Sequence, residues 1–323
     1  MIQHRQDFYA GIWEGAAKEL GAHIEPLPHG FWEIREGGNT TRVKDRFVML
    51  DDALTLQLAL DKSLVHSILT ESGLPVPRYV EIQYADLGPA RRLIEASAGS
   101  VVVKPAAGTG GGDGLTCGVR TESDLQRASL RAAQWSRRIL VEETIEGSVF
   151  RLLFLDGKLL DVVERRSPTL IGSGEATVEE LIIRENYERI SARGARGLQL
   201  LRVDLDCLFA LKRQGWTLRT VIPEGSPVTV KSATNEYGPQ DSRTIHRELS
   251  PELIGSAKRA ASLVGLRLAG VDVVTPDPSA PLDKVGGKII EVNGSPGLHH
   301  HYIVDPADEH TAVAVPILRV LVS

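Results

Sequence analysis

The sequence predicts an α/β (α+β) fold assembled from several helix-and-strand units. Short apolar runs such as 101–103 and 139–141 are typical of buried strands, and Asp156-Gly157 between two apolar runs is a strong hairpin signal. Amphipathic segments that begin at capping residues lie between them, as expected of helices. With 42% hydrophobic and 24% charged residues among 323, the composition excludes a disordered or coiled-coil chain as the main architecture.

The N-terminal region, residues 1–60, combines a helix with short extended pieces. The helix is predicted over 9–20. The segment Glu36-Gly37-Gly38-Asn39 is a turn signal, and it predicts a hairpin made of strands 31–35 and 43–50.

Residues 61–145 are expected to form a compact α/β subdomain with a glycine-rich loop. A helical pattern over 52–72, which Asp51 or Asp52 can cap and Gly73 can end, leads into it. The prolines of Leu74-Pro75-Val76-Pro77 then favour an extended segment. The further predicted elements are a helix over 87–97, a strand over 101–103, a helix that begins at Thr121 and a strand over 139–141.

Residues 146–323 carry more strand signals and are expected to form a second subdomain. Ser250-Pro251 is typical of a helix start, because serine caps the helix and proline fits its first turn. A helical insert within 167–197 is expected to cover the site. The predicted elements are strands 149–155 and 158–164, helix 178–189, helix 250–265, and strands 268–274 and 288–292.

Charge and cysteine content narrow the function classes. The net charge of −5 gives no basic field for nucleic acid or an anionic membrane. Cys117 and Cys207 cannot build a disulfide framework. Neither the polar start of the chain nor the apolar run 312–322 suits a signal peptide or a spanning helix. We therefore expect a soluble, cytoplasmic protein without nucleic-acid or membrane partners.

The segment from 101 to 114 indicates phosphate binding. An apolar strand leads to Lys104, and five glycines follow within residues 108–114. The backbone N–H groups of such a loop can approach phosphate oxygens, and the lysine adds a positive charge. A merely flexible loop with an unrelated lysine is the alternative. Because Lys104 ends a strand facing this loop, we expect Lys104→Met to weaken binding of the phosphate-bearing ligand and leave thermal stability nearly unchanged.

Oxygen-rich side chains near the end of the chain indicate a site for a hard cation. Glu291 and Asn293 lie two apart on a predicted strand and share one face, and antiparallel pairing with 269–274 would bring Asp272 beside Glu291. Two carboxylates and an amide oxygen suit Mg²⁺, whereas an exposed sheet face is the alternative. At 139–147 a strand end with carboxylates could hold a flat base and accept from a ribose hydroxyl, or it could be an ordinary strand end.

In combination and in order, these pieces resemble the ATP-grasp superfamily, and more specifically the ATP-grasp module of cyanophycin synthetases. The resemblance covers about residues 30–310. It rests on Phe31-Trp32-Glu33-Ile34-Arg35-Glu36-Gly37, Asp61-Lys62, Lys104 with its glycine loop, Val141-Glu142-Glu143-Thr144-Ile145, Thr177-Val178-Glu179-Glu180-Leu181-Ile182, Asp272, Glu291-Val292-Asn293 and Pro296-Gly297-Leu298.

The resemblance implies an ATP-grasp fold, with ATP held between two α+β subdomains after a short N-terminal domain. It also implies ATP and Mg²⁺ as cofactors, with Mn²⁺ as an alternative ion. The ATP-binding residues that it implies are Lys62, Lys104, Gly108, Gly110, Gly111, Gly112, Glu142, Glu143, Thr144 and Ile145; the metal ligands are Asp272, Glu291 and Asn293; the catalytic cations are Arg151 and Lys231; and the substrate-binding residues are Arg165, Ser295, Gly297 and His300.

The chain departs from cyanophycin synthetases on the substrate side. It has no room for their extra N-terminal domain or their Mur-ligase-like domain, and Val149 stands where an acidic residue near the ribose is expected. We therefore expect a stand-alone module that does not make cyanophycin. His299-His300-His301 could bind a transition metal, but neighbours in sequence do not easily reach one ion, which favours a substrate contact.

The activity that the resemblance implies is an ATP-dependent carboxylate–amine ligase. It would join amino-acid-like or peptide substrates through an acyl phosphate and release ADP and phosphate. An ATP-grasp phosphotransferase and a non-catalytic nucleotide-binding module are the alternatives. The two substrates and the oligomeric state, with a homodimer among the options, stay open.

Overall fold

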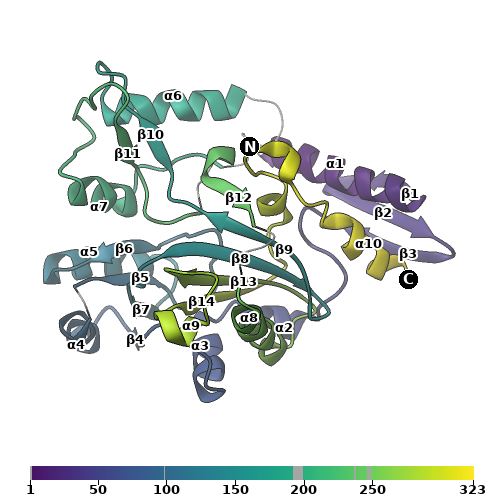
Figure 1. Cartoon of the computed structure of the whole chain (residues 1–323), viewed down its shortest axis with the longest axis horizontal. Helices are drawn as coiled ribbons and strands as arrows, with labels where there is room; N and C mark the ends of the chain where they lie inside the picture. The colour runs from purple at the N-terminus through teal and green to yellow at the C-terminus, as the bar shows by residue number, and fades with distance from the viewer. Residues whose placement is uncertain (1, 98, 192–198, 236–237, 246–248) are drawn as a thin grey trace.

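A computed structural model describes residues 2–97, 99–191, 199–235, 238–245 and 249–323. A five-stranded sheet lies at its centre, between a four-stranded sheet and a three-stranded sheet (Figure 1). A further pair of strands with two helices lies above the four-stranded sheet in this view. Mixed helices and antiparallel sheets confirm the α/β (α+β) class that the sequence predicts.

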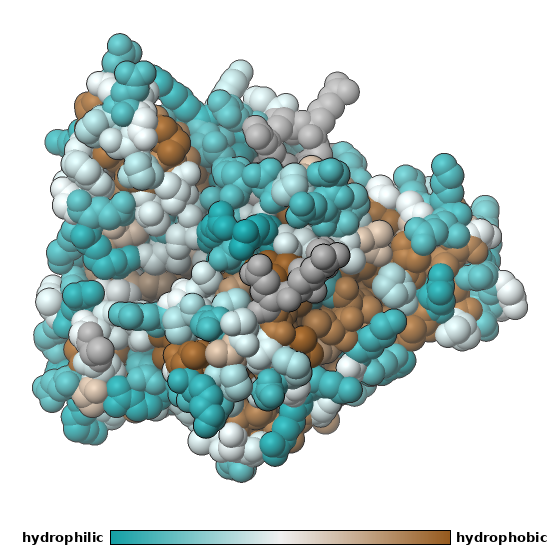
Figure 2. Space-filling view, in the orientation of Figure 1, coloured by the Kyte–Doolittle hydropathy of each residue, from teal (hydrophilic) through white to brown (hydrophobic). Residues whose placement is uncertain are grey.

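The N-terminal unit is a three-stranded sheet covered by the first and last helices of the chain. Trp13 and Ile34 are fully buried in the core that they share, and apolar side chains gather around the last helix (Figure 2). The hairpin turn at Gly37-Gly38 is confirmed. The predicted strand 43–50 is wrong, because Lys44 and Phe47 bond each other across a turn and end the strand at Val43. The elements are α1 (Ile2–Leu20), β1 (His23–Leu27), β2 (Phe31–Glu36), β3 (Asn39–Val43) and α10 (Ala314–Val322).

The four-stranded sheet has the order β4-β7-β5-β6, and two helices cover it. Thr121 caps the second helix, as predicted, because its hydroxyl accepts a hydrogen bond from Asp124 N. The glycine loop joins the neighbouring strands β5 and β6, so both of its ends are held by one sheet. The elements are β4 (Tyr79–Ile82), α4 (Gly88–Ala96), β5 (Val101–Pro105), β6 (Thr116–Val119), α5 (Glu122–Ala133) and β7 (Ile139–Glu143).

The five-stranded sheet has the order β12-β9-β8-β13-β14. The Asp156-Gly157 hairpin joins β8 and β9, and Asp272 on β13 pairs with Glu291 on β14, both as predicted. Ser250 caps α8 and Gly265 ends it at a φ of 85°. The elements are β8 (Ser148–Leu155), β9 (Lys158–Arg165), β12 (Ser242–Thr244), α8 (Pro251–Val264), β13 (Leu268–Thr275), α9 (Leu282–Val285) and β14 (Lys288–Gly294).

The helical pattern of 52–72 forms two helices, α2 (Ala53–Ala59) and α3 (Lys62–Glu71), rather than one. Asp61 is extended at the break, where its carboxylate caps α3 and forms an ion pair with Arg138 at 2.6 Å. Both helices pack on α8 and β14, so α3 belongs to the core of the larger sheet. The predicted division into 1–60, 61–145 and 146–323 stays a prediction.

The last unit combines two short strands with two helices. Its α7 packs on β6 of the four-stranded sheet. The expected cover, 167–197, contains β10 and α6, and its residues 192–197 lie outside the described residues. Among the residues described, no helix is long and apolar enough to cross a membrane. The elements are β10 (Thr169–Ile171), α6 (Val178–Ser191), α7 (Leu205–Arg213) and β11 (Pro227–Thr229).

Candidate functional site

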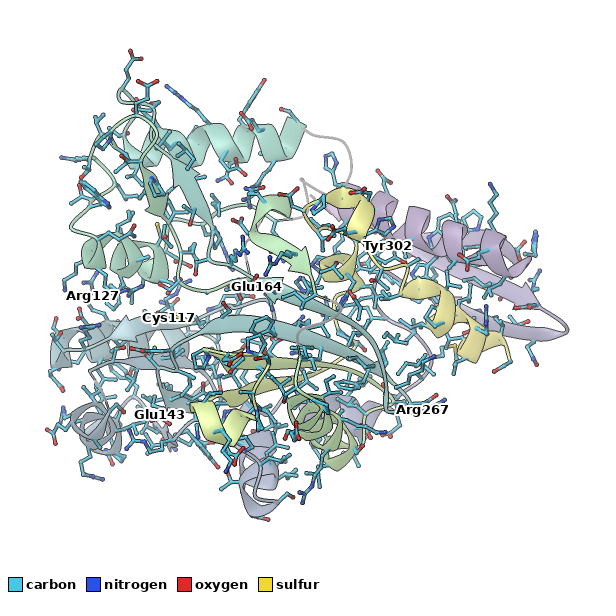
Figure 3. All side chains as sticks on the ribbon, in the orientation of Figure 1. Cys117, Arg127, Glu143, Glu164, Arg267 and Tyr302 are labelled. Atoms are coloured by element: carbon cyan, nitrogen blue, oxygen red, sulfur yellow. The ribbon has the colours of Figure 1, made fainter. Side chains whose placement is uncertain are left out.

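A cavity of about 480 Å³ lies between the four-stranded and five-stranded sheets. Figure 3 shows Cys117 and Glu143 on the side of the smaller sheet, and Glu164 on β9 of the larger one. The predicted site residues that line this cavity are Lys104, Gly112, Glu142, Glu143, Thr144, Ile145, Arg165, Asp272 and Glu291. The structure therefore brings together residues that lie far apart in the chain.

Lys104 at the end of β5 belongs to a buried charge cluster. Its Nζ lies 2.8 Å from Glu142 Oε1, and His66 Nε2 lies 2.8 Å from the same oxygen. Burial by itself would raise the pKa of Glu142, but Lys104 and His66 lower it to about 2. Burial opposes the charge of Lys104 as well, yet Glu142 and Glu291 keep its pKa above the ordinary value. Lys104 and Glu142 are both charged at neutral pH.

The two carboxylates that follow Val141 are committed to protein partners. Glu142 pairs with Lys104 and His66, whereas Glu143 accepts from the backbone N and from Nε of Arg78, at 2.9 and 2.7 Å. That they also accept from a ribose hydroxyl stays a prediction, because each carboxylate keeps oxygen lone pairs beyond these contacts. The residues still line the wall of the cavity next to Thr144 and Ile145.

Lys62 lies where the two sheets and the glycine loop meet. Its Nζ donates to Thr109 O at 2.9 Å and lies 3.5 Å from Glu291 Oε1. Its backbone N donates to Ala106 O, just before the loop. A lysine that looked isolated in the sequence therefore joins the loop, β5 and β14 at one point.

Asp272, Glu291 and Asn293 converge on β13 and β14, as the strand pairing predicts. Both oxygens of Asp272 accept from Arg151, at 2.6 and 2.5 Å, and Arg165 lies 3.5 Å away. Burial alone would raise the pKa of Glu291, but Lys62, Lys104 and the two arginines lower it. Asn293 donates through Nδ2 to Gly270 O at 3.2 Å, which leaves its side-chain oxygen available.

This donor set suits a hard cation. A carboxylate has about four lone-pair sites, so Asp272 can bind a bidentate arginine and still offer an oxygen lone pair. Two charged carboxylates and an amide oxygen are ligands that Mg²⁺ accepts. Within the described ranges, no group of three His, Cys, Asp or Glu side chains is arranged to hold a metal ion. The histidines at 299–301 therefore do not form such a group either.

A second cavity of about 170 Å³ adjoins the first and shares Gly112, Arg165, Asn235 and Glu291 with it. The other predicted site residues in its lining are Lys62, Gly110, Gly111, Arg151, Asn293, Ser295, Gly297 and His300. Arg5 and Arg46 also line it and were not predicted, and so does His299, one of the three histidines for which a substrate contact is expected. His301 lies outside this lining, because its fully buried ring pairs with Asp161 at 2.6 Å.

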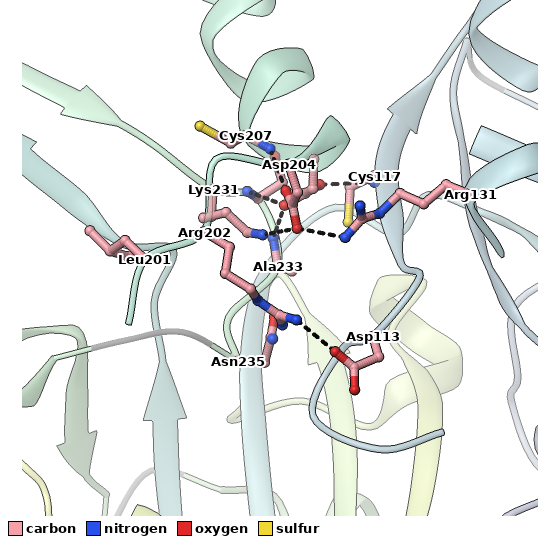
Figure 4. A network of polar contacts seen from close by, with 12 residues as sticks. Asp113, Cys117, Arg131, Leu201, Arg202, Asp204, Cys207, Lys231, Ala233 and Asn235 are labelled. Carbon is pink, nitrogen blue, oxygen red and sulfur yellow. Dashed lines mark hydrogen bonds and ion pairs between the residues drawn. The ribbon is translucent and has the colours of Figure 1, made fainter. Parts of the chain in front are cut away.

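Two predicted residues lie outside the lining of both cavities. Gly108 is at the start of the loop, where its φ of 78° turns the backbone. Lys231 is almost fully buried and pairs with Asp204 at 2.7 Å, and Arg131 shares that carboxylate (Figure 4). The structure thus places the Lys231 ammonium in a network behind the cavity wall, and its catalytic role stays a prediction.

The glycine loop is held from the opposite side by two polar contacts. Arg202 pairs with Asp113 at 2.6 Å (Figure 4). Asn235 donates to Gly111 O at 2.5 Å. Arg202 lies just before α7, which packs on the same sheet as the loop, and Asn235 follows β11. The sequence contains no signal for these contacts, because single polar residues far along the chain supply them.

Comparisons with known proteins agree with this architecture. No protein-family model matches the chain. Over 295 residues, 90% of its length, the chain is 34% identical to a cyanophycin synthetase of Geminocystis herdmanii, and it spans 33% of that protein. The chain therefore covers about a third of the curated relative that it matches.

Two solved structures share the fold. A bifunctional glutathione synthetase from Pasteurella multocida matches 96% of this chain and 42% of its own, with a TM-score of 0.59 and 21% identity. A D-alanine–D-alanine ligase from Bacillus anthracis matches 84% of this chain and 71% of its own, with a TM-score of 0.50 and 15% identity. At these identities the similarity concerns the fold alone.

Proposed function

Because this chain belongs to the ATP-grasp superfamily, we propose that it is an ATP-dependent carboxylate–amine ligase acting on amino-acid-like or peptide substrates. The observation that carries the proposal is the convergence of Lys62, Lys104 and the glycine loop beside Glu291. Lysines and loop N–H groups are the partners that phosphate oxygens require. ATP and a divalent cation, Mg²⁺ or Mn²⁺, are the proposed cofactors.

ATP would occupy the first cavity, with its base between the strand end at Glu142–Ile145 and the larger sheet. Its phosphates would lie under Gly110, Gly111 and Gly112, within reach of Lys62 and Lys104. Asp272, Glu291 and Asn293 would hold magnesium, which supplies charge neutralisation for the β- and γ-phosphates when bound.

The proposed reaction has two displacement steps. A carboxylate oxygen of the acid attacks the γ-phosphorus of ATP, and the bond to the ADP oxygen breaks, which gives an acyl phosphate and ADP. The amine then attacks the acyl carbon, phosphate leaves, and the nitrogen loses a proton to form the amide. Activation is needed because a free carboxylate has no adequate leaving group at neutral pH.

The second cavity would hold the acid, because it joins the proposed phosphate site at Glu291. Arg151 and Arg165 provide guanidinium groups for the reacting carboxylate and the transferred phosphoryl group. Ser295, Gly297 and His300 line the same space. Lys231 would act on the transferred phosphate only after releasing Asp204. The 167–197 insert is proposed as a cover that protects the acyl phosphate from water.

ADP release with pooled amino acids and peptides tests the proposal, with Mg²⁺ present or chelated. We expect release that requires an acid, an amine and the metal together, and mass spectrometry then identifies the amide. ADP release without an amine, with a phosphorylated acid as product, would favour a phosphotransferase. ATP binding without turnover in any pool would favour a non-catalytic nucleotide-binding module.

A further inference from the structure

Positive charge is concentrated at the end of the second cavity that residues of the N-terminal unit line. Arg5 comes from α1 and Arg46 from the turn after β3, and both line the cavity with Arg151 and Arg165. Asp272 already neutralises much of the Arg151 and Arg165 charge. Asp45 lies 3.9 Å from Arg5, and its negative charge also raises the pKa of Arg46. One carboxylate therefore acts on both guanidinium groups.

Crowding of these cations is visible in their effect on neighbouring groups. Burial and the charge of Arg5 lower the pKa of Arg46. Burial, followed by Arg5, Arg151 and Arg46, lowers the pKa of His299 well below its ordinary value. His299 is therefore neutral at neutral pH. Positive groups packed in this way are stabilised when an anion binds among them.

His299 adds a hydrogen-bond donor to the same wall. Its Nδ1 lies 2.9 Å from the Tyr9 hydroxyl, and its backbone N donates to that hydroxyl at 3.5 Å. In the tautomer whose Nδ1 accepts the Tyr9 hydroxyl proton, the neutral ring carries its own proton on Nε2. Nε2 is buried and has no hydrogen-bond partner within the described part of the chain. A buried donor without an acceptor costs free energy that a ligand oxygen would recover.

We propose that Arg5, Arg46 and His299 form a second anion site, which binds a carboxylate of the substrate other than the one that reacts. The inference rests on the proposed function, which puts the reacting carboxylate beside Arg151 and Arg165. The acid is then a dicarboxylic compound, such as an acidic amino acid or a peptide with an acidic side chain. Guanidinium groups and an N–H donor match the oxygens of such a group.

Calorimetric titration in the presence of Mg²⁺ and ADP tests the site with succinate and butyrate, which have the same number of carbon atoms. We expect succinate to bind the intact protein about tenfold more tightly, as hydrogen bonds to a charged group predict. Arg5→Met and Arg46→Met should each remove most of this preference, and Arg46→Lys should keep part of it. Arg42→Met is the matched control, because Arg42 is an exposed arginine of the same unit that pairs with Glu33 at 2.6 Å. It should keep the full preference.

Equal affinity for the two acids, no binding of succinate, or a preference that survives in the Arg5→Met/Arg46→Met double variant would overturn the proposal. Inorganic phosphate that binds through Arg46 more tightly than succinate would overturn the dicarboxylate assignment. ADP release is measured separately. Succinate binding that depends on Arg46, with no ADP release for any acid, would refute the ligase proposal alone. ADP release with monocarboxylic acids only would refute this inference alone.

Discussion

Lys104→Met should destabilise the protein, contrary to the expectation from the sequence that its stability would hardly change. Lys104 is not at an open strand end, because its Nζ lies 2.8 Å from a Glu142 carboxylate that is only 3% exposed. Methionine can fill the space of the lysine stem but carries no charge. The variant therefore leaves Glu142 buried, with the His66 ring at 2.8 Å as its remaining side-chain contact.

The structure sets the size of this effect at about 3 kcal/mol. Removing one partner of a buried ion pair costs ~3–5 kcal/mol, and His66 at 2.8 Å keeps the loss at the lower end. The pKa of Glu142, lowered to about 2, agrees in sign, because Lys104 is the first of the charges that stabilise this buried carboxylate in its charged form.

Urea unfolding at pH 7, followed by circular dichroism, measures the change in the free energy of unfolding. The double variant Lys104→Met/Glu142→Gln also removes the buried charge of Glu142, so we expect it to recover most of the stability. Its affinity for ATP should stay as low as that of Lys104→Met. Arg91→Met breaks an exposed pair with Glu122 and should cost less than ~1 kcal/mol. A Lys104→Met protein as stable as the unsubstituted one, or a double variant that recovers nothing, would refute this reasoning.

Three further outcomes are expected. Glu291→Gln should lower the unfolding temperature somewhat, because Lys62 and Lys104 lose a charged partner. It should lower ADP release by about 100-fold at saturating Mg²⁺, because it removes a charge from the proposed metal site, and undiminished turnover would contradict that role. Hydroxylamine in place of the amine should trap the activated acid as a hydroxamate with one ADP released, whereas stoichiometric AMP would contradict the acyl-phosphate route. Gly112→Ala should raise the KM for ATP about tenfold, since φ is +77° there and the new Cβ would lie 2.4 Å from Asn235 Nδ2. Gly110→Ala meets nothing within 4 Å, so its KM should change less, and equal effects would speak against a loop held by Asn235.

The parts of the fold that follow from local chemistry could be predicted. Turn residues determine the Gly37-Gly38 and Asp156-Gly157 hairpins, and Ser250 and Gly265 determine the ends of α8, because each acts on its own neighbours. The break between α2 and α3 was not predicted. Asp61 caps α3 there, which is a local signal, but its ion pair with Arg138, 77 residues away in the chain, is not visible in the sequence.

The same distinction applies to the candidate site. The pairing of Asp272 with Glu291 follows from two neighbouring strands, so sequence spacing was sufficient. Partners chosen by tertiary packing were not visible, as with the Glu142 carboxylate and Lys231. Arg5 and Arg46 are single charges in a unit outside the matched phosphate motifs. Their place in the site becomes apparent only in the fold, where α1 and the turn after β3 bring both arginines close to His299.

The anchoring of the glycine loop limits how far it can travel. At the start of the loop, Ala106 N donates to Arg138 O, Ala106 O accepts from the backbone N of Lys62, and Ala107 forms a β-bridge with Asp61. At its other end the loop is fixed where β6 begins at Thr116. Between these anchors, residues 108–115 can move only when the contacts of Thr109, Gly111 and Asp113 with Lys62, Asn235 and Arg202 are released. Eight residues span at most ~26 Å when extended, so the tip can rise by no more than ~13 Å. Such a short arc would let the loop clear the phosphates of the proposed nucleotide, while the cavity wall on β7 stays in place.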